Sequence, residues 1–314
     1  MKIRPANIEK DLPDIVRITN PYENTPLTVD QVRSFFQYNP PGRIQLRLVA
    51  VDVNGVLTGY GGMIHEASAP AGHFINWVII DPAFRCQGIG AALWKALASA
   101  LQEQDARHLE ADVFDNDPVS LAFAEQRGFT IDHHAFASCL DLTVFDETPY
   151  QPVIDSLSAQ GIRFCSLADF PDTRVTRRKL YKLNSTFVLD IPNQQDHHLE
   201  YPEFEKYVLE APWFRREGQL LAVDGRAWVG LAAVGLSPEM HSAYNAVTGL
   251  LRAYRGRKIG LALKVLAARY ARQCGARQIM TDNDSTNAPI LGINQKLGYR
   301  PKPGKYGLVC RMDR

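Results

Sequence analysis

The sequence lacks the features that define several large classes of protein. No apolar run in its 314 residues approaches the roughly 20 residues that a helix needs to cross a bilayer. The first residues, MKIRPANIEKDLPD, contain acidic side chains and no apolar core, so a secretory signal is not expected. The 35 basic and 34 acidic side chains leave a formal net charge of +1, which provides no global attraction to nucleic acid or to a membrane.

Cysteine is scarce and shows no functional spacing. The chain has five cysteines, no CxxC pair, and no cysteine in a recognisable His-partnered signature. An odd, scattered set is typical of reduced thiols and favours a cytoplasmic protein over a disulfide-stapled or zinc-binding one. The pairs His133-His134 and His197-His198 lack the spacing of metal ligands on a helix, so no metal is expected.

What the chain does contain is a repeat at an offset of 170 residues. The sequence RCQGIGAAL at Arg85–Leu93 is matched by RGRKIGLAL at Arg255–Leu263. An ungapped comparison of residues 83–128 with residues 253–298 gives twelve identities. A repeat of this length is a whole domain rather than a unit of a solenoid.

The length of the chain suits two such domains, each with its own core. We expect one domain at residues 1–145 and the other at residues 161–314. A stretch at residues 146–160 carries Pro149 and Pro152 and is predicted to be the linker.

Both halves predict the same order of elements, which is two helices, an antiparallel meander, a βαβα segment and a final strand. In the first half Asn7 and Thr28 are predicted helix caps, Asn54-Gly55 is a hairpin turn, and Phe136–Leu142 is the last strand. The fold class is therefore α/β (α+β mixed sheet), with one parallel crossover in each half.

A glycine-containing loop joins a buried strand to a helix in the first half. From Ile79 the chain reads IIDPAFRCQGIGAALWKAL, so Gly88 and Gly90 lie where the helix begins. Glycine lets backbone N–H groups approach a ligand, and the positive end of a helix favours phosphate or pyrophosphate. Tight packing of helix on strand explains a single GxG equally well, and the duplication moves the balance towards a ligand. The loop is neither a P-loop nor a dinucleotide fingerprint, because its spacing and its place after a fourth strand fit neither.

These residues resemble the GNAT superfamily of acyl-CoA-dependent N-acyltransferases. Arg85-Cys86-Gln87-Gly88-Ile89-Gly90 matches the R/Q-x-x-G-x-G/A signature, and AEQRGF at Ala124–Phe129 is similar to the end of the family's last helix. The second copy, from TGLLRAYRGRKIGLALK to TDNDSTNAPILGINQKLGY, resembles the C-terminal half of tandem GNAT proteins. The resemblance implies two GNAT domains in tandem, with acetyl-CoA (coenzyme A) as the expected co-substrate.

The resemblance also implies which residues hold the coenzyme. Backbone amides near Gln87–Ala91 and Arg257–Leu261 would bind its pyrophosphate, and the strand ends at Ile80 and Leu250 would carry its pantetheine arm. The candidate cofactor-binding residues are Ile80, Arg85, Gln87, Gly88, Gly90, Ala91, Asn116, Leu250, Arg255, Arg257, Lys258, Gly260, Leu261, Asn287 and Asn294.

Two residues of this sequence depart from the family pattern at positions expected to bind the coenzyme or to act in catalysis. Lys258 stands where the signature has its first glycine, so its side chain either clashes with the phosphate or pairs with it. Ala124 and Asn294 occupy the positions at which many GNAT enzymes place a general-acid tyrosine. Neither half inherits that tyrosine.

A basic run follows the second strand end. Seven basic residues and no acidic residue lie between Leu250 and Arg272, and they are Arg252, Arg255, Arg257, Lys258, Lys264, Arg269 and Arg272. Such a run suits the phosphates of coenzyme A, with a solvated helix face as the second interpretation and nucleic acid as a distant third.

Acyl transfer to an amine requires removal of a proton from the ammonium form. We call the glycine-containing loop of each half the cradle and the helix that follows it the cradle helix. Carboxylates on the strand after the cradle helix are candidate bases. Glu110 and Asp112 alternate on one face of that strand, and Asp282 is the counterpart of Asp112 in the second copy. Pairing with nearby arginines is the competing interpretation for each carboxylate. His65 and His73 are further possible bases near neutral pH.

We therefore expect an N-acetyltransferase that transfers an acetyl group from acetyl-CoA to a primary amine by direct attack. The acceptor is expected to be a small molecule, with no nucleic acid or membrane partner, and the protein a monomer or homodimer. A non-catalytic acyl-CoA-binding protein with degenerate GNAT domains stays open, because both tyrosines are missing. The sequence leaves open which half is active.

Overall fold

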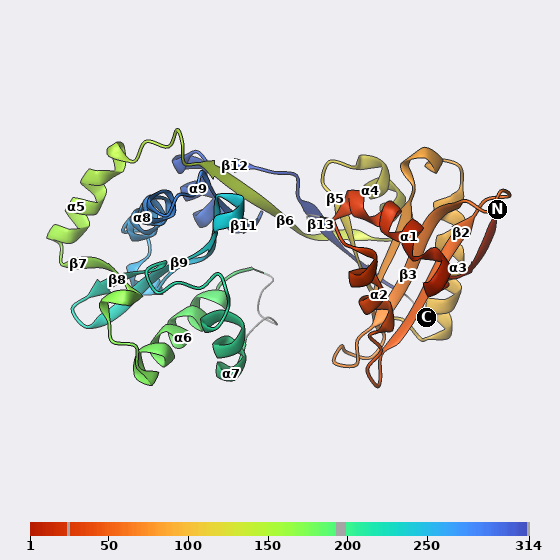
Figure 1. Ribbon diagram of the computed structural model, residues 1–314, viewed down its shortest axis with the longest axis horizontal. Coiled ribbons are helices and arrows are strands. Elements are labelled where there is room, and N and C mark those ends of the chain that lie inside the picture. Colours follow the sequence, from red (N-terminus) through yellow and green to blue (C-terminus); the bar gives the residue numbers. More distant parts are fainter. Residues whose placement is uncertain (24–25, 193–198, 313–314) are drawn as a thin grey trace. The chain divides into compact units, whose positions relative to one another are not determined.

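The chain forms two compact units in the computed structural model, which describes residues 1–23, 26–192 and 199–312 (Figure 1). Unit 1 holds residues 1–132 together with the segment from Tyr306 onward, and unit 2 holds His133–Lys305. The pair His197-His198 lies outside the described residues. Among the helices in the described ranges, none has the length and hydropathy of a membrane span.

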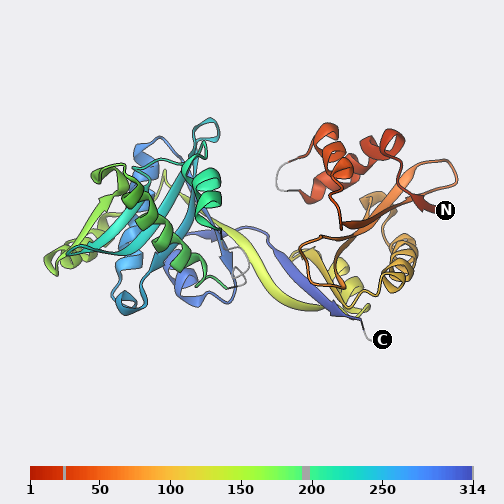
Figure 2. The same ribbon diagram turned by 90° about the horizontal axis from the view of Figure 1, so that it is seen from below.

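Unit 1 is a mixed sheet in the strand order β1-β2-β3-β4-β5-β13. Strands β1 to β4 pair antiparallel, and β4 pairs with β5 in parallel, as the sequence predicted. Its elements are β1 (Lys2–Pro5), α1 (Ile8–Thr19), α2 (Val29–Gln37), β2 (Ile44–Val51), β3 (Leu57–His65), β4 (His73–Ile80), α3 (Ile89–Glu103), β5 (His108–Phe114), α4 (Pro118–Glu125) and β13 (Lys305–Arg311). Helices α1 and α2, in red and orange, lie on the opposite face of the sheet from α3 (Figure 2).

Short-range signals fix several boundaries of unit 1. The Asn7 side chain accepts hydrogen bonds from the N–H groups of Glu9 and Lys10, which caps α1. Thr28 and Gln31 form a capping box at the start of α2. Gly55 has a φ of 85° in the turn between β2 and β3. The predicted caps and hairpin are confirmed.

The core of unit 1 depends on the apolar stripe of α3. Leu93, Leu97 and Leu101 recur at helical spacing and have no exposed surface. Burial of each contributes about 1.5–3 kcal/mol. This stripe fixes α3 against the sheet, so the loop that precedes the helix is held at the end of β4.

Unit 2 repeats the plan with the strand order β6-β11-β10-β9-β8-β7, and β12 also pairs with β6. Its elements are β6 (Thr130–Asp141), α5 (Gln151–Ala159), β7 (Ile162–Ser166), α6 (Arg174–Val188), α7 (Tyr201–Phe204), β8 (Gln219–Asp224), β9 (Ala227–Ser237), β10 (Ser242–Leu250), α8 (Ile259–Gln273), β11 (Gln278–Asp284), α9 (Ala288–Leu297) and β12 (Arg300–Pro301). Helices α6 and α7 cover one face of the sheet, and α5, α8 and α9 cover the other (Figure 1).

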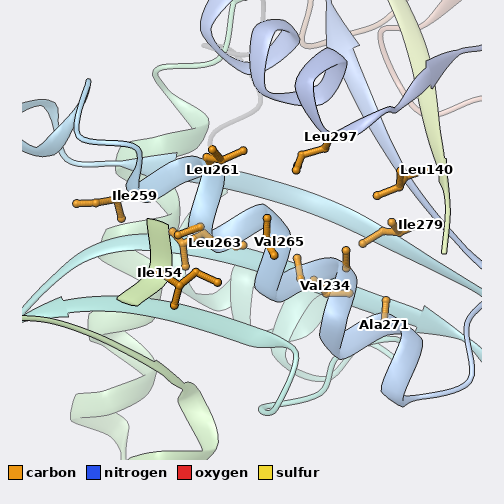
Figure 3. Close-up of a cluster of buried hydrophobic side chains, with 14 of the residues drawn as sticks. Leu140, Ile154, Val234, Ile259, Leu261, Leu263, Val265, Ala271, Ile279 and Leu297 are labelled. Atoms are coloured by element: carbon orange, nitrogen blue, oxygen red, sulfur yellow. The ribbon is translucent and has the colours of Figure 1, made fainter. Parts of the chain in front are cut away.

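The helix α5 replaces the linker expected at residues 146–160. Ile154 and Leu157 of α5 join the core around α8, which Figure 3 shows with Ile154 beside Leu263. Pro149 and Pro152, which suggested a linker, both lie in the first turn of a short helix. A first-turn proline sacrifices no intrahelical hydrogen bond, so these prolines are compatible with helix.

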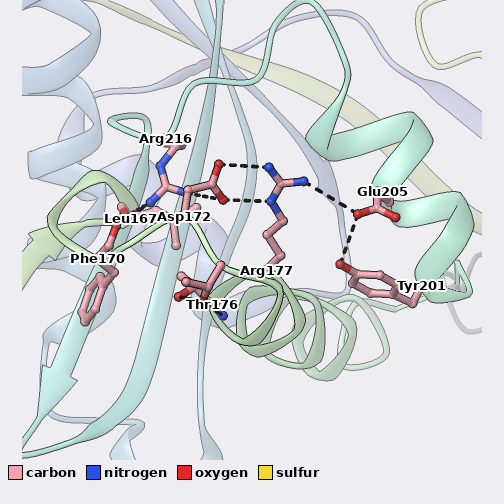
Figure 4. Close-up of polar contacts among 9 residues, drawn as sticks. Leu167, Phe170, Asp172, Thr176, Arg177, Tyr201, Glu205 and Arg216 are labelled. Carbon is pink, nitrogen blue, oxygen red and sulfur yellow. Dashed lines mark hydrogen bonds and ion pairs between the residues drawn. The ribbon is translucent and has the colours of Figure 1, made fainter.

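An ion-pair network in unit 2 links the start of α6 to the segment after α7 and to the loop before β8 (Figure 4). The guanidinium of Arg177 donates to both carboxylate oxygens of Asp172, at 2.8 and 2.9 Å. Arg216 lies 2.9 Å from the same carboxylate, and Glu205 lies 3.8 Å from Arg177. This bidentate pairing raises the pKa of Arg177 and lowers the pKa of Asp172, so both stay charged.

Two strands lie in a different unit from the one that the repeat predicts for them. The segment Phe136–Leu142 was expected to be the last strand of the first domain. Instead, β6 continues into unit 2, where Ser138 is paired with Thr281 of β11. In unit 1 the place beside β5 is taken by β13 from the C-terminal end of the chain. The sequence could not show this exchange, because the two strands have similar apolar patterns.

We predict that β13 is required for the stability of unit 1. Leu308 is 1% exposed and contacts a cluster that includes Phe74 and Leu109. Leu308→Ala should lower the free energy of unfolding by about 2–5 kcal/mol, the usual range for a buried leucine. Urea unfolding measures this loss. Val119→Ala, at a residue 58% exposed, is the control, and equal effects of the two changes would contradict the assignment.

Candidate functional site

The loop before the cradle helix has the same left-handed bends in both units. In unit 1, Cys86 and Gly88 have φ angles of 60° and 80°. In unit 2, Gly256 and Lys258 have φ angles of 76° and 66°. A non-glycine residue in this conformation costs about 1–2 kcal/mol, yet each loop keeps one. The departure at Lys258 therefore leaves the backbone of the loop unchanged.

The glycines of the two loops have two separate roles. A Cβ added at Gly88 or Gly256 would meet no heavy atom within 4 Å, so these residues serve the left-handed bend and open space lies in front of them. A Cβ at Gly90 would come within 3.2 Å of Phe123, and one at Gly260 within 3.4 Å of Ile293. The second glycine of each signature therefore serves close packing of helix against helix.

This loop is suited to an anion. Consecutive N–H groups in a bend of left-handed residues form a concavity that attracts phosphate, and the positive end of a helix adds to the attraction. Gln87 and Ala91 are exposed beside the loop of unit 1, and Arg257 and Lys258 beside that of unit 2. The space in front of Gly88 and Gly256 is open within 4 Å of where a Cβ would lie, so an anion can approach both loops.

The other candidate cofactor residues near the loops differ in their surroundings. Asn116 is exposed, but the cap of α4 is its neighbour Asp117, which is the counterpart of Asn287 at the start of α9. Leu261 is 4% exposed in the core around α8, so its side chain is unavailable to a ligand although its amide lies in the first turn. Ile80 and Leu250 end their strands beside Gly90 and Gly260, respectively.

The arginines of the signature are paired within the protein. Arg85 lies 2.9 Å from the Asp117 carboxylate and donates to the Tyr22 hydroxyl at 2.6 Å. Arg252 and Arg255 both pair with Asp190 in unit 2. Both arginines lower the pKa of Asp190, which keeps this carboxylate ionised. Arg85 and Arg255 thus brace the loop and neutralise nearby acids.

Several residues of the basic run between residues 250 and 272 are paired or buried. Besides the pair on Asp190, Arg269 and Arg272 both pair with Glu147, and Lys264 has no exposed surface. The acids that neutralise these arginines come from distant parts of the sequence. Arg257 and Lys258 remain exposed beside the loop.

The candidate bases lie on the exposed face of the strand after each cradle helix. Glu110 is paired with its neighbour His108, at 3.4 Å between Nε2 and Oε1. In unit 2, the hydroxyl of Tyr244 donates to the Asp282 carboxylate. Burial and this hydrogen bond raise the pKa of Tyr244, so the phenol stays protonated and Asp282 is the acceptor. Asp112, the counterpart of Asp282, is exposed in unit 1.

Unit 2 has a polar interior behind its cradle. Lys264, Asn294 and Tyr299 are 0%, 3% and 6% exposed. Among the described residues, the Nζ of Lys264, the Oδ1 of Asn294 and the Oη of Tyr299 have no hydrogen-bond partner. Lys264 Nζ lies 4.7 Å from the centre of the Tyr299 ring, and Asn294 donates to Asn283 at 2.7 Å. Unsatisfied buried groups of this kind are rare and are concentrated at functional sites.

Unit 1 is apolar at the same positions. The counterparts of Lys264, Asn294 and Tyr299 at the 170-residue offset are Trp94, Ala124 and Phe129. Trp94 and Phe129 pack edge to face with ring centres 5.7 Å apart. The fold therefore accepts an apolar interior here, and the polar groups of unit 2 are not needed to form it.

The sequence reasoning missed Tyr244 and the role of Lys264. Tyr244 lies on an apolar strand, and a single tyrosine there gives no signal without its partner. Lys264 was counted with the basic run, although a lysine on the apolar side of a helix next to Leu263 and Val265 is a signal of burial. Comparing the two copies position by position would have found it.

The chain is similar to N-acetyltransferases. The family model described as Acetyltransferase (GNAT) family matches residues 12–129. Over 286 residues the chain is 27% identical to the mycothiol acetyltransferase of Renibacterium salmoninarum, covering 87% of this chain and 77% of that protein. It is 28% identical over 262 residues to the mycothiol acetyltransferase of Corynebacterium glutamicum, covering 79% and 77% of the two chains.

Two solved structures share the fold over the full length. A GCN5-related N-acetyltransferase from Sphaerobacter thermophilus aligns with a TM-score of 0.65 and 16% identity, covering 99% of this chain and 95% of that one. A tandem GNAT protein from the clavulanic acid biosynthesis pathway aligns with a TM-score of 0.63 and 18% identity, covering 100% and 99%.

We predict that valine at the left-handed glycines removes coenzyme A binding. Gly88→Val and Gly256→Val should each weaken binding to their own unit at least tenfold, because a β-branched residue cannot hold a positive φ without moving the loop. Isothermal titration with coenzyme A measures the affinity. Gly55→Val and Gly275→Val are matched controls, since both positions also have a φ of 85° and open space. Equal affinities in all four variants would exclude the loops as the binding site.

We also predict that Lys264 makes the stability of unit 2 depend on pH. Burial lowers its pKa from 10.5 to about 7, so between these values the unfolded chain binds more protons than the folded one. The free energy of unfolding is therefore not reduced by this lysine above pH 10.5. It decreases as the pH falls from 10.5 to 7, with a slope of up to about 1.4 kcal/mol per pH unit. The difference in unfolding free energy between wild type and Lys264→Met should therefore change between pH 7.5 and 9. Parallel pH profiles would show that the lysine is not buried.

Proposed function

This chain is a tandem protein of the GNAT family and an acetyl-CoA-dependent N-acetyltransferase, and on that premise we propose that unit 2 transfers the acetyl group to the amine of a small molecule. Two finer expectations belong to the proposal. One is that the protein acts in the cytoplasm, which fits its five free cysteines. The other is that it is a monomer or a homodimer.

The observation that carries the proposal is the shared geometry of the two loops. The left-handed positions are the same in unit 1 and unit 2, although glycine fills a different one in each. Two loops that keep a strained backbone while their side chains diverge are under a common constraint. A backbone concavity at a helix start supplies that constraint when its ligand is a pyrophosphate.

Two features of unit 2 support its assignment as the catalytic unit. Asp282 accepts a hydrogen bond from Tyr244 on the exposed face of the sheet, whereas its counterpart Asp112 has no tyrosine in the matching register, where Ile75 lies. The interior of unit 2 also keeps unsatisfied polar groups at positions where unit 1 is apolar. The family model matches unit 1, so unit 1 keeps the fold and the loop of the family.

The mechanism that fits these residues is direct transfer. The amine must be neutral to attack, and the Asp282 carboxylate is the group placed to accept its proton. The nitrogen then bonds to the thioester carbonyl carbon and the carbon–sulfur bond breaks. The acylated nitrogen releases its second proton to solvent, and the coenzyme leaves as a thiolate that takes up a proton from solvent. A backbone N–H at the strand end can stabilise the developing oxyanion. No residue of the chain becomes acylated.

The relatives suggest the class of acceptor. The curated relatives are named mycothiol acetyltransferases, and we extend to this chain a small amine of that kind as the acceptor. At 27–28% identity the name does not fix the acceptor, so related amines belong in the test. A non-catalytic acyl-CoA-binding protein is the second candidate, favoured by Ala124 and Asn294 at the position of the family's tyrosine.

We predict that turnover depends on Asp282 and not on its counterpart. Asp282→Asn should lower kcat by about 100-fold or more, the usual contribution of a general base, and should leave coenzyme A affinity unchanged. Asp112→Asn is the matched control in unit 1 and should leave kcat unchanged. The assay follows free coenzyme A by chromatography, because an acceptor with its own thiol would react with thiol reagents.

Three outcomes would change the proposal. A large loss in Asp112→Asn alone would place the reaction in unit 1. Equal activity in both variants would remove the carboxylates as bases. Coenzyme A binding without any release of the thiol across a panel of small amines would favour the binding protein.

A further inference from the structure

A cluster of two histidines and a glutamate lies at the start of the parallel strand pair in unit 1. His73 is the first residue of β4 and His108 the first residue of β5, and the two stand directly opposite each other in the register. Glu110 follows two residues later on β5, so its side chain is on the same face as that of His108. The three side chains therefore meet although they come from positions 35 residues apart in the sequence.

These side chains point away from the core of unit 1. The next residues along the strands, Phe74 and Leu109, are 2% and 0% exposed and belong to the apolar cluster under α3. Side chains alternate along a strand, so His73, His108 and Glu110 project from the opposite face. Ile75 on that face is 50% exposed, which shows that the face is open to solvent and to ions at this point.

The distances fit a metal centre. One ligand atom from each of His73, His108 and Glu110 can be chosen so that all three lie within 4.8 Å of one another. His108 Nε2 and Glu110 Oε1 are 3.4 Å apart. Ligands of a tetrahedral ion with bonds of about 2.0–2.1 Å are about 3.4 Å apart, so this pair already has the required spacing. The imidazole rings of His73 and His108 are stacked with centres 4.5 Å apart, which places the third ligand next to this pair.

We propose that His73, His108 and Glu110 form a binding site for a divalent transition-metal ion, with Zn²⁺ as the first choice. Two imidazole nitrogens and one carboxylate oxygen suit Zn²⁺, Co²⁺ or Ni²⁺ and disfavour Mg²⁺ and Ca²⁺, which prefer oxygen alone. Three protein ligands leave a fourth position for water. The spacing of metal ligands along one helix does not indicate this site, because its ligands lie on two strands and are up to 37 residues apart in the sequence.

The duplication supplies an internal comparison. In unit 2 the same register pairs Ser242 with Gln278, and Met280 follows at the position of Glu110. None of these three side chains is a usual ligand for Zn²⁺. The strand pair thus forms without the three ligands, and their presence together in unit 1 is not a requirement of the fold.

The position of the site suggests what the ion does. Register pairs between β4 and β5 are limited to His73–Ile75 with His108–Glu110, at the end of β4 remote from the cradle. The seven steps from His73 to Ile80 span about 23 Å of strand. An ion here would clamp the two strands at the only stretch where they pair within the described residues, and would leave the loop at Cys86 and Gly88 free for its own ligand.

Metal titration with a triple variant tests the site. The variant His73→Ser, His108→Gln, Glu110→Met copies the residues of unit 2, which the same strand pair already accommodates. Isothermal titration of untagged protein with Zn²⁺ should show one equivalent bound by wild type and at least a tenfold loss of affinity in the variant. Co²⁺ should give a visible absorption band typical of low coordination number in wild type only, and Zn²⁺ should raise the Tm of wild type only.

The double variant His133→Gln, His134→Gln is the control and should bind like wild type. Absence of Zn²⁺ binding to wild type, or equal binding by wild type and the triple variant, would overturn the proposal. Loss of binding in the control with retention in the triple variant would also overturn it, by moving the ion to the other histidine pair. Circular dichroism of each variant confirms that a loss of binding is not a loss of fold.

Discussion

The left-handed backbone before each cradle helix is the constraint on which the rest of this structure depends. It places the first N–H groups of α3 and α8 around an open space at the end of a strand, and it persists where Cys86 or Lys258 must adopt an unfavourable φ. The apolar stripes of these helices hold them on the sheet and so fix the bend. Paired arginines then brace the loop from outside, as Arg85 does with Asp117.

The two copies have kept this geometry and diverged around it. Unit 2 has Lys264 and Tyr299 in the interior where unit 1 has an aromatic pair, and it has a contact between Tyr244 and Asp282. Unit 1 has kept an apolar interior and carries histidines at the start of its parallel strands. Unit 1 requires β13 from the C-terminal end of the chain, and unit 2 includes β6 from the stretch expected for the first domain.

Local signals in the sequence predicted most of the elements. The caps at Asn7 and Thr28 and the turn at Gly55 depend on neighbouring residues and were correct. Features that depend on residues distant in the sequence could not be predicted from it. These include the strand exchange, the helix α5 in the predicted linker, and the pairing of the basic run with Asp190 and Glu147. Asp282 could be found from the repeat as the counterpart of Asp112, but only the structure shows that Asp282 has a tyrosine partner and that Glu110 has a histidine partner.

The central claim is that the amides of these left-handed bends hold the pyrophosphate of coenzyme A. A crystal structure of the protein grown with coenzyme A tests it most directly. The account predicts pyrophosphate oxygens within hydrogen-bonding distance of the backbone N–H groups between Arg257 and Leu261, with the thiol directed towards Asp282. Coenzyme A bound to unit 2 with its pyrophosphate on side chains elsewhere, and those N–H groups bonded only to water, would contradict it.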